Sequence, residues 1–216
     1  MAETVRKNPL LTALAAVLLL SLIISTGVVL TLHLRFIYYN DIKALYIEEM
    51  SGMPEEKIRE NYDVLIDYNL VWNQEPLKFP DFPMSVSGET HFREVKRIFD
   101  VFPILFIVSL AAMTFLWIKA KSLRNGRYAR ITGYCCFGIV AALGLFALIG
   151  WDRLFVLFHK VFFNNDFWVF DYTTDPVITI LPDTFFLHEA ILILAVVLTG
   201  GALALIFGIK AKHRGK

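Results

Sequence analysis

Long apolar runs alternate with polar segments along this chain. The apolar runs cover residues 9–34, 101–118, 131–149 and 185–209. A run of about 18 or more apolar residues can cross a hydrocarbon core of ~30 Å as a helix, so the pattern predicts four transmembrane helices. The first run begins like a signal peptide, but it is too long for a signal-peptide core and lacks a small-residue cleavage site. We therefore expect an uncleaved helix.

The polar segments between these runs differ in charge. The connection 119–130 and the tail 210–216 carry Lys and Arg without any acid, and Arg6 and Lys7 precede the first run. Positive charge marks the cytoplasmic side of a membrane protein. Residues 35–100 and 150–184, in which acidic residues outnumber basic ones, would then form one cap on the outer face. The expected fold is an all-α, four-helix transmembrane stem with a mixed extracytoplasmic cap and both termini in the cytoplasm.

The first cap segment, residues 35–100, contains two helical patterns. Ser51 or Met53, followed by Pro54 and two glutamates, predicts a helix start. Apolar residues then recur at helical spacing up to Trp72. Residues 73–90 are rich in Pro and Gly and predict loop or short strands. From Glu89 a second helical pattern leads into the apolar run 101–118, with Lys96 and the neighbouring arginines off its apolar face.

Composition excludes several classes of protein. A mean hydropathy of +0.57 is too high for a soluble globule. The net charge of +1 gives no electrostatic footprint for nucleic acid. Cys135 and Cys136 are adjacent within one apolar run, which excludes a disulfide framework and a Cys-x-x-Cys zinc site. No feature of the sequence indicates an oligomeric state.

Histidines are the strongest candidates for chemistry, because the sequence has no Gly-x-Ser-x-Gly, Walker, His-Glu-x-x-His or Gly-x-Gly-x-x-Gly motif. His33, His188 and His213 lie at the ends of apolar runs or in the basic tail and resemble interfacial or surface residues. His91 and His159 lie in apolar sequence on the predicted outer side, shortly before the second run and shortly after the third. In an antiparallel bundle these two positions lie at similar depth.

Two other interpretations of His91 and His159 are open on the residues alone. One is that they are unrelated, the first on a helix face and the second packed in a core. The other is a zinc site completed by outer carboxylates, although no ligand spacing supports it, and we expect no metal or other cofactor. Aromatic residues crowd positions 151–172. Such crowding is typical of a membrane-interface belt and also of an apolar pocket for acyl chains.

Short motifs surround both histidines. HFREVKRIF, residues 91–99, leads into the second apolar run. FHKVFF, WVFD and DPVITILP follow in order between residues 158 and 182. These motifs, in this order relative to the apolar runs, resemble the lipoprotein intramolecular transacylase family, Lit, over nearly the whole chain. The resemblance implies a four-helix enzyme in the plasma membrane of Gram-positive bacteria, with an extracellular cap.

The resemblance also implies an activity. Members of this family move the sn-2 acyl chain of an S-diacylglyceryl-cysteine lipoprotein to its N-terminal α-amino group, which gives an N-acyl lyso-form lipoprotein. It implies that His91 and His159 are catalytic. The chain departs from the family pattern after the first histidine, where the pair Arg93-Glu94 stands at the place of an acid. The partners would be a diacylated lipoprotein and membrane lipid. The residues expected to contact substrate are Phe92, Phe158, Phe162, Trp168 and Asp175.

The chemistry suits two histidines, because intramolecular aminolysis of an ester needs no nucleophile from the enzyme. One imidazole can accept the amine proton while the other protonates the leaving oxygen or stabilises the oxyanion. Two alternatives from other classes are a membrane lipid hydrolase or acyltransferase with the same histidines, and a non-enzymatic membrane binding protein. Release of free fatty acid would indicate the hydrolase, and activity that survives loss of either histidine would indicate the binding protein.

Overall fold

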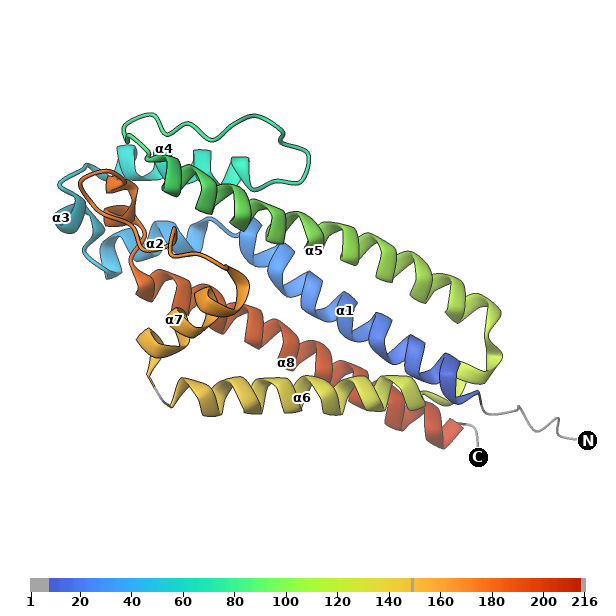
Figure 1. Ribbon diagram of the computed structural model, residues 1–216. Helices are drawn as coiled ribbons and strands as arrows, with labels where there is room; N and C mark the ends of the chain where they lie inside the picture. The colour runs from blue at the N-terminus through green and yellow to red at the C-terminus, as the bar shows by residue number, and fades with distance from the viewer. Residues whose placement is uncertain (1–7, 149, 215–216) are drawn as a thin grey trace, which may run out of the picture. The chain divides into compact units, whose positions relative to one another are not determined.

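The computed structural model describes residues 8–148 and 150–214. The predictions for residues 1–7, residue 149 and residues 215–216 lie outside these residues. The long helices are α1 (Pro9–His33), α5 (Val86–Lys119), α6 (Arg127–Ala147) and α8 (Asp183–Arg214) (Figure 1). All four are long and apolar enough to cross a membrane. The described residues contain no strand, so the predicted all-α, four-helix membrane fold is confirmed.

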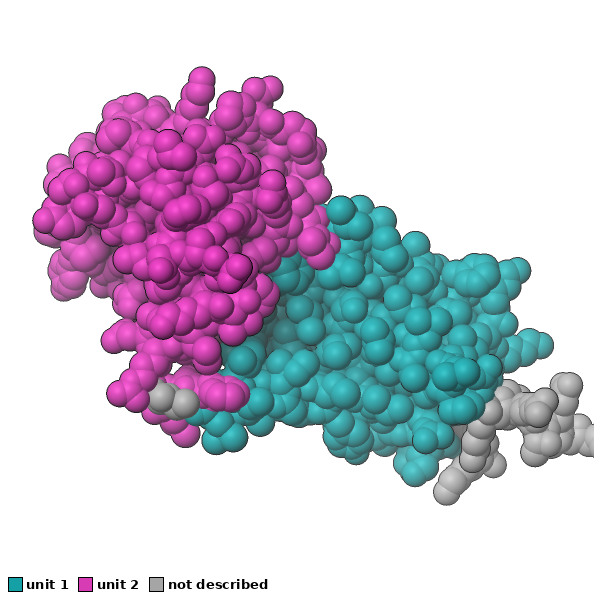
Figure 2. All heavy atoms as spheres, in the orientation of Figure 1, with its two compact units in different colours: residues 1–28, 102–145, 193–216 teal, residues 29–101, 146–192 magenta. Residues whose placement is uncertain are grey.

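The chain divides into two compact units (Figure 2). The stem unit contains residues 1–28, 102–145 and 193–216, and the cap unit contains residues 29–101 and 146–192. The helices α1, α5, α6 and α8 therefore each contribute residues to both units, whereas the 3₁₀ helix η1 (Lys121–Asn125) belongs to the stem unit.

Small residues allow close helix packing within the stem unit. A Cβ added to Gly133 of α6 would lie 2.9 Å from the carbonyl oxygen of Gly201 in α8, so only glycine fits there. Thr132 donates from its hydroxyl to the carbonyl of Ala16 in α1 (3.0 Å). Gly133 thus brings α6 and α8 into close contact. At Gly138, by contrast, an added Cβ would meet no described atom within 4 Å.

The cap unit is built from short helices and loops. Its shorter helices are α2 (Phe36–Ala44), α3 (Ile47–Ser51), α4 (Glu55–Tyr68), α7 (Trp151–Phe162) and the 3₁₀ helix η2 (Pro176–Ile180). The expected helix start at Pro54 is correct, but neither Ser51 nor Met53 caps α4. The Glu48 carboxylate instead accepts the backbone N–H of Glu55 (2.9 Å). Residues 73–85 are loop rather than short strands.

The two segments that were predicted to form one cap, residues 35–100 and 150–184, share one apolar core. The ring of Tyr38 in α2 stacks on Tyr62 of α4 with centroids 3.7 Å apart, and Phe185 packs edge-on against both. The hydroxyl of Tyr38 donates to the carbonyl of Ile180 in η2 (2.6 Å). Buried hydroxyls need such a partner, so this bond ties the residues after α7 to the first cap segment.

Candidate active site

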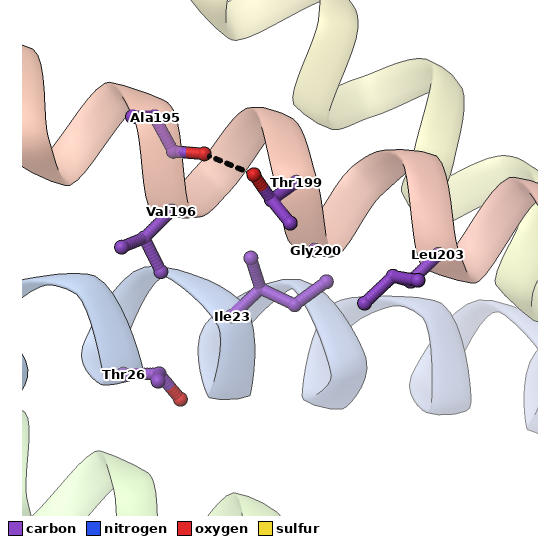
Figure 3. Close-up of a pocket in the computed structure, with 7 residues that line it drawn as sticks. All are labelled: Ile23, Thr26, Ala195, Val196, Thr199, Gly200 and Leu203. Atoms are coloured by element: carbon purple, nitrogen blue, oxygen red, sulfur yellow. Dashed lines mark hydrogen bonds between the residues drawn. The ribbon is translucent and has the colours of Figure 1, made fainter.

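The stem unit has an open groove between α1 and α8 (Figure 3). Its lining residues are Ile23, Thr26, Ala195, Val196, Thr199, Gly200 and Leu203. Each of its two hydroxyls donates a hydrogen bond within its own helix: Thr199 to the carbonyl of Ala195 (2.8 Å) and Thr26 to the carbonyl of Leu22 (2.6 Å). The lining includes no ionisable side chain, so this groove offers no acid or base for catalysis.

The cap unit places a histidine near the start of α5. Ser85 precedes the helix, and its hydroxyl accepts the N–H of Gly88 (3.0 Å), as a helix N-cap does. The backbone N–H of Ser85 donates to the Asp175 carboxylate (2.7 Å). An added Cβ at Gly88 would collide with this carboxylate and crowd the Phe170 ring. Glycine therefore allows the segment after α7 to approach the first turns of α5.

His91 lies one turn further along α5 and is only 6% exposed. Aromatic rings surround its imidazole, with centroid distances of 4.8 Å to Phe163 and 5.5 Å to Phe170. Its Nδ1 is buried and has no hydrogen-bond partner among the described residues. A buried polar atom without a partner is costly, and such an atom is a candidate for contact with a substrate.

His159 lies in the last turns of α7 and is 8% exposed. Its Nδ1 is 2.7 Å from the carbonyl oxygen of Phe155. A carbonyl can only accept, so Nδ1 carries the proton and the neutral ring presents Nε2 as a proton acceptor. Burial lowers the pKa of His159 below its ordinary value of 6.5, although the Phe155 carbonyl partly opposes this. The imidazole is therefore neutral at neutral pH.

The structure brings the two predicted histidines together. The ring centroids of His91 and His159 are 5.8 Å apart. Phe163 contacts both rings, at 4.8 Å from His91 and 5.6 Å from His159, and Trp168 stacks on His159 at 4.7 Å. Two imidazoles within one aromatic enclosure can exchange protons with substrate groups held beside them while excluding water.

The residues expected to contact substrate occupy three environments. Phe92 is buried in the cap core and stacks on Phe170. Asp175 is also buried, and its carboxylate accepts from Ser85 and from the Thr174 hydroxyl, so its visible contacts are structural. Trp168 covers His159. Phe158 and Phe162, by contrast, present exposed apolar faces on α7, as expected for contact with an acyl chain or membrane lipid.

His33 and His188 do not join this pair. His33 contacts the carbonyl of Val29 in its own helix (2.7 Å). His188 lies in α8 with Nδ1 2.9 Å from both oxygens of the Asp41 carboxylate in α2. Sequence reasoning placed His188 at the membrane interface and missed this pair. No sequence pattern points to this pair; the structure shows that Asp41 is buried on α2 beside Tyr38 and Ile42, where a carboxylate needs a partner.

The described residues hold no cluster of three or more His, Cys, Asp or Glu side chains that could bind a metal ion. Glu94, three residues after His91, accepts hydrogen bonds from Asn165 at both oxygens (3.0 and 3.1 Å). Ser85 and Ser87 are the serines shortly before His91; the Ser85 hydroxyl is engaged in the cap of α5 and in a contact with that of Ser87 (2.9 Å).

Comparison with known proteins gives consistent matches. The sequence model of the family described as lipoprotein intramolecular transacylase Lit matches residues 13–186. The structure of the membrane integral Lit from Bacillus cereus is similar with a TM-score of 0.87 and 28% identity, over 95% of this chain and 96% of that one. A variant of that protein with histidine replaced by alanine matches with a TM-score of 0.78 and 30% identity, over 95% and 94%. Comparison with curated protein sequences gave no match.

Proposed function

The chain belongs to the lipoprotein intramolecular transacylase family, Lit, and from this we propose that it moves the sn-2 acyl chain of a diacylated lipoprotein to that lipoprotein's own α-amino group. It is a multi-pass membrane acyltransferase that acts on lipoproteins. We propose three further points: that the acyl chain moves from the sn-2 position to the α-amino group, which residues catalyse the transfer, and how the protein is oriented in the membrane. The observation that carries the proposal is the buried pair His91 and His159, with ring centroids 5.8 Å apart.

The bond changes follow from the substrate. The lipoprotein's amine nitrogen attacks the sn-2 ester carbonyl carbon, a C–N bond forms, and the C–O bond to glycerol breaks. The amine loses a proton and the glycerol oxygen gains one, so the enzyme supplies no atom to the product. Its contribution is proton transfer and orientation, and holding two groups of one substrate in contact contributes up to ~7–11 kcal/mol.

We assign the base to His159. The Phe155 carbonyl holds the proton on Nδ1, and burial keeps the ring neutral, so Nε2 accepts the amine proton. His91 is then the group that donates to the carbonyl or to the leaving oxygen. Its unpartnered Nδ1 supports contact with a substrate group. The proton that His159 has accepted passes to the leaving glycerol oxygen, directly or through His91, so both rings end neutral.

The surroundings support a lipid substrate. Phe158 is 46% and Phe162 55% exposed on α7; Phe158 directly precedes the buried histidine, and its ring packs against that of Phe162. Exposed apolar side chains on a helix at a membrane surface contact acyl chains, and we propose this role for both residues. The proposed topology places the cap unit outside the cell, where a membrane-anchored lipoprotein presents its ester near headgroup level. Phe92, Trp168 and Asp175 would shape and support the site.

A lipopeptide with differently labelled sn-1 and sn-2 chains tests this proposal. The purified protein should give a product whose α-amino group carries the sn-2 label and whose glycerol retains the sn-1 chain, as measured by mass spectrometry. Transfer of the sn-1 label would contradict the proposed regiochemistry. Labelled free fatty acid without any N-acylation would identify a hydrolase instead.

A further inference from the structure

The loop that follows α7 supplies three of the rings that enclose the histidine pair. We call residues 163–170 the aromatic loop. Phe163 contacts both imidazoles, Trp168 stacks on His159, and Phe170 packs against His91. The enclosure of the two histidines therefore depends on how this loop is held.

Asn165 organises the fold of the aromatic loop. Its side-chain oxygen accepts the N–H of Phe167 (3.0 Å), and its backbone carbonyl accepts the indole N–H of Trp168 (3.1 Å). These two bonds set the turn and orient the indole that covers His159. The side-chain amide nitrogen remains free of these local contacts and faces α5.

Glu94 receives that amide nitrogen. The Nδ2 of Asn165 lies 3.0 and 3.1 Å from the two carboxylate oxygens of Glu94. Glu94 is three residues after His91 in α5 and therefore on a neighbouring face of the same helix. Among the described residues no other hydrogen bond joins the aromatic loop to α5. One charged contact thus connects the helix of one histidine to the loop that covers the other.

We propose that Glu94 and Asn165 form a clasp that keeps the aromatic loop closed over the histidine pair, and that this closure directs the acyl group to the amine rather than to water. This inference rests on the proposed function. Both are positioning residues, since they act through Trp168 and Phe163. A hydrogen bond to a charged group is among the stronger ones in proteins, whereas the loop's packing contacts are individually weak.

The clasp matters because water competes with the amine for the same ester. If water attacks the sn-2 carbonyl carbon, the C–O bond to glycerol breaks, free fatty acid leaves, and the glycerol oxygen takes a proton. The product is then a lyso-lipoprotein with an unmodified amine. The same two histidines can promote either attack, so the ratio of fatty acid to N-acyl product reports how well the loop excludes water.

Asn165→Asp tests the clasp directly. The new carboxylate keeps the acceptor for Phe167 but faces the carboxylate of Glu94, so both hydrogen bonds are lost and two like charges meet. We expect N-acyl transfer to fall by about ten- to a hundredfold, with fatty acid release rising relative to transfer. Adding Glu94→Gln should restore most of the transfer, because the glutamine amide then donates to the aspartate. Products would be counted by mass spectrometry with the labelled lipopeptide.

Asn164→Asp is the matched control, since it makes the same change at the exposed neighbouring residue and should leave both products unchanged. If Asn165→Asp does not fold, Glu94→Ala removes the acceptor from α5 without altering the loop, and it should raise the fatty-acid ratio likewise. A wild-type product ratio in Asn165→Asp or Glu94→Ala, or no recovery in the double variant, would overturn the clasp. Failure of the wild-type protein to acylate the amine would overturn the proposed function instead.

Discussion

At the residue scale, two features of the surroundings of His159 shift its pKa in opposite directions: the apolar rings around it and the carbonyl of Phe155. The apolar rings remove water from the imidazole, which disfavours the charged form. The carbonyl of Phe155 accepts a hydrogen bond from Nδ1–H, which partly offsets the effect of burial on the pKa. The net result is a pKa below the ordinary 6.5, so the ring is available as a base without first losing a proton.

The same shift predicts how the protein's stability depends on pH. The folded-state pKa of His159 lies below its unfolded value, so protons bind more tightly to the unfolded chain. The stability that the neutral ring contributes is complete above about pH 6.5 and is lost as the pH falls through the folded pKa. In detergent, the melting temperature between pH 8 and pH 5 should therefore decrease more for the wild type than for His159→Gln. Equal decreases would contradict the burial effect.

Sequence reasoning at this scale identified the residue types but not their partners. His91 and His159 stand out because an imidazole in apolar sequence near a membrane surface is costly unless it is used. Three contacts join residues that lie 71 to 147 positions apart in the chain: His188 with Asp41, Asp175 with Ser85, and Asn165 with Glu94. No local pattern encodes such contacts, so the sequence alone could not predict them.

At the scale of elements, the position of His91 depends on where α5 begins. Asp175 binds the N–H of Ser85, and the lack of a side chain at Gly88 allows this approach. A bulkier residue at Gly88 must push Asp175 and Phe170 away, although alanine itself is the better helix former. Packing and intrinsic propensity therefore act in opposite directions at this position.

We expect Gly88→Ala to lower stability by about 1–3 kcal/mol, the usual cost of overpacking, and to reduce transacylation because Phe170 packs on His91. Thermal unfolding in detergent and product formation measure the two effects. Gly138→Ala is the control: an added Cβ meets no described atom within 4 Å, so the change should be neutral or stabilising by up to ~1 kcal/mol. Equal behaviour of the two variants would refute the close contact at Gly88.

The elements that could be predicted are those with a strong apolar period. The four long helices follow from hydropathy, and α4 follows from the spacing of Ile58, Tyr62 and Leu65, all of which are buried. The short helices α2 and α3 were missed because tertiary packing, rather than local pattern, stabilises helices of this length. The helix α7 was given no bounds from the sequence, although its polar and apolar residues alternate as in a strongly amphipathic helix.

At the scale of the whole molecule, the distribution of basic residues predicts the orientation in the membrane. The connection that contains η1 is basic and acid-free, whereas acidic residues predominate in the outer segments. A single cysteine in place of Lys57, with Cys135 and Cys136 replaced by alanine, should react with a membrane-impermeant maleimide in intact cells. A single cysteine in place of Arg124 should react only after the membrane is opened. The reverse pattern would invert the proposed topology.

The central claim is that His91 and His159 act together on the ester and the amine. Positioned acids and bases typically contribute 10²–10⁴-fold, and groups that act as a unit lose most of that effect when either is removed. His33→Gln and His188→Gln are the controls, because neither residue contacts the pair.

The most direct measurement is therefore the yield of N-acyl lyso-lipoprotein by mass spectrometry for His91→Asn, His159→Gln and the double variant, each checked for folding in detergent. We predict that each single variant loses at least about a hundredfold of the wild-type rate and that the double variant is little worse. Wild-type activity in either single variant would remove that histidine from the mechanism, and wild-type activity in both would contradict the account.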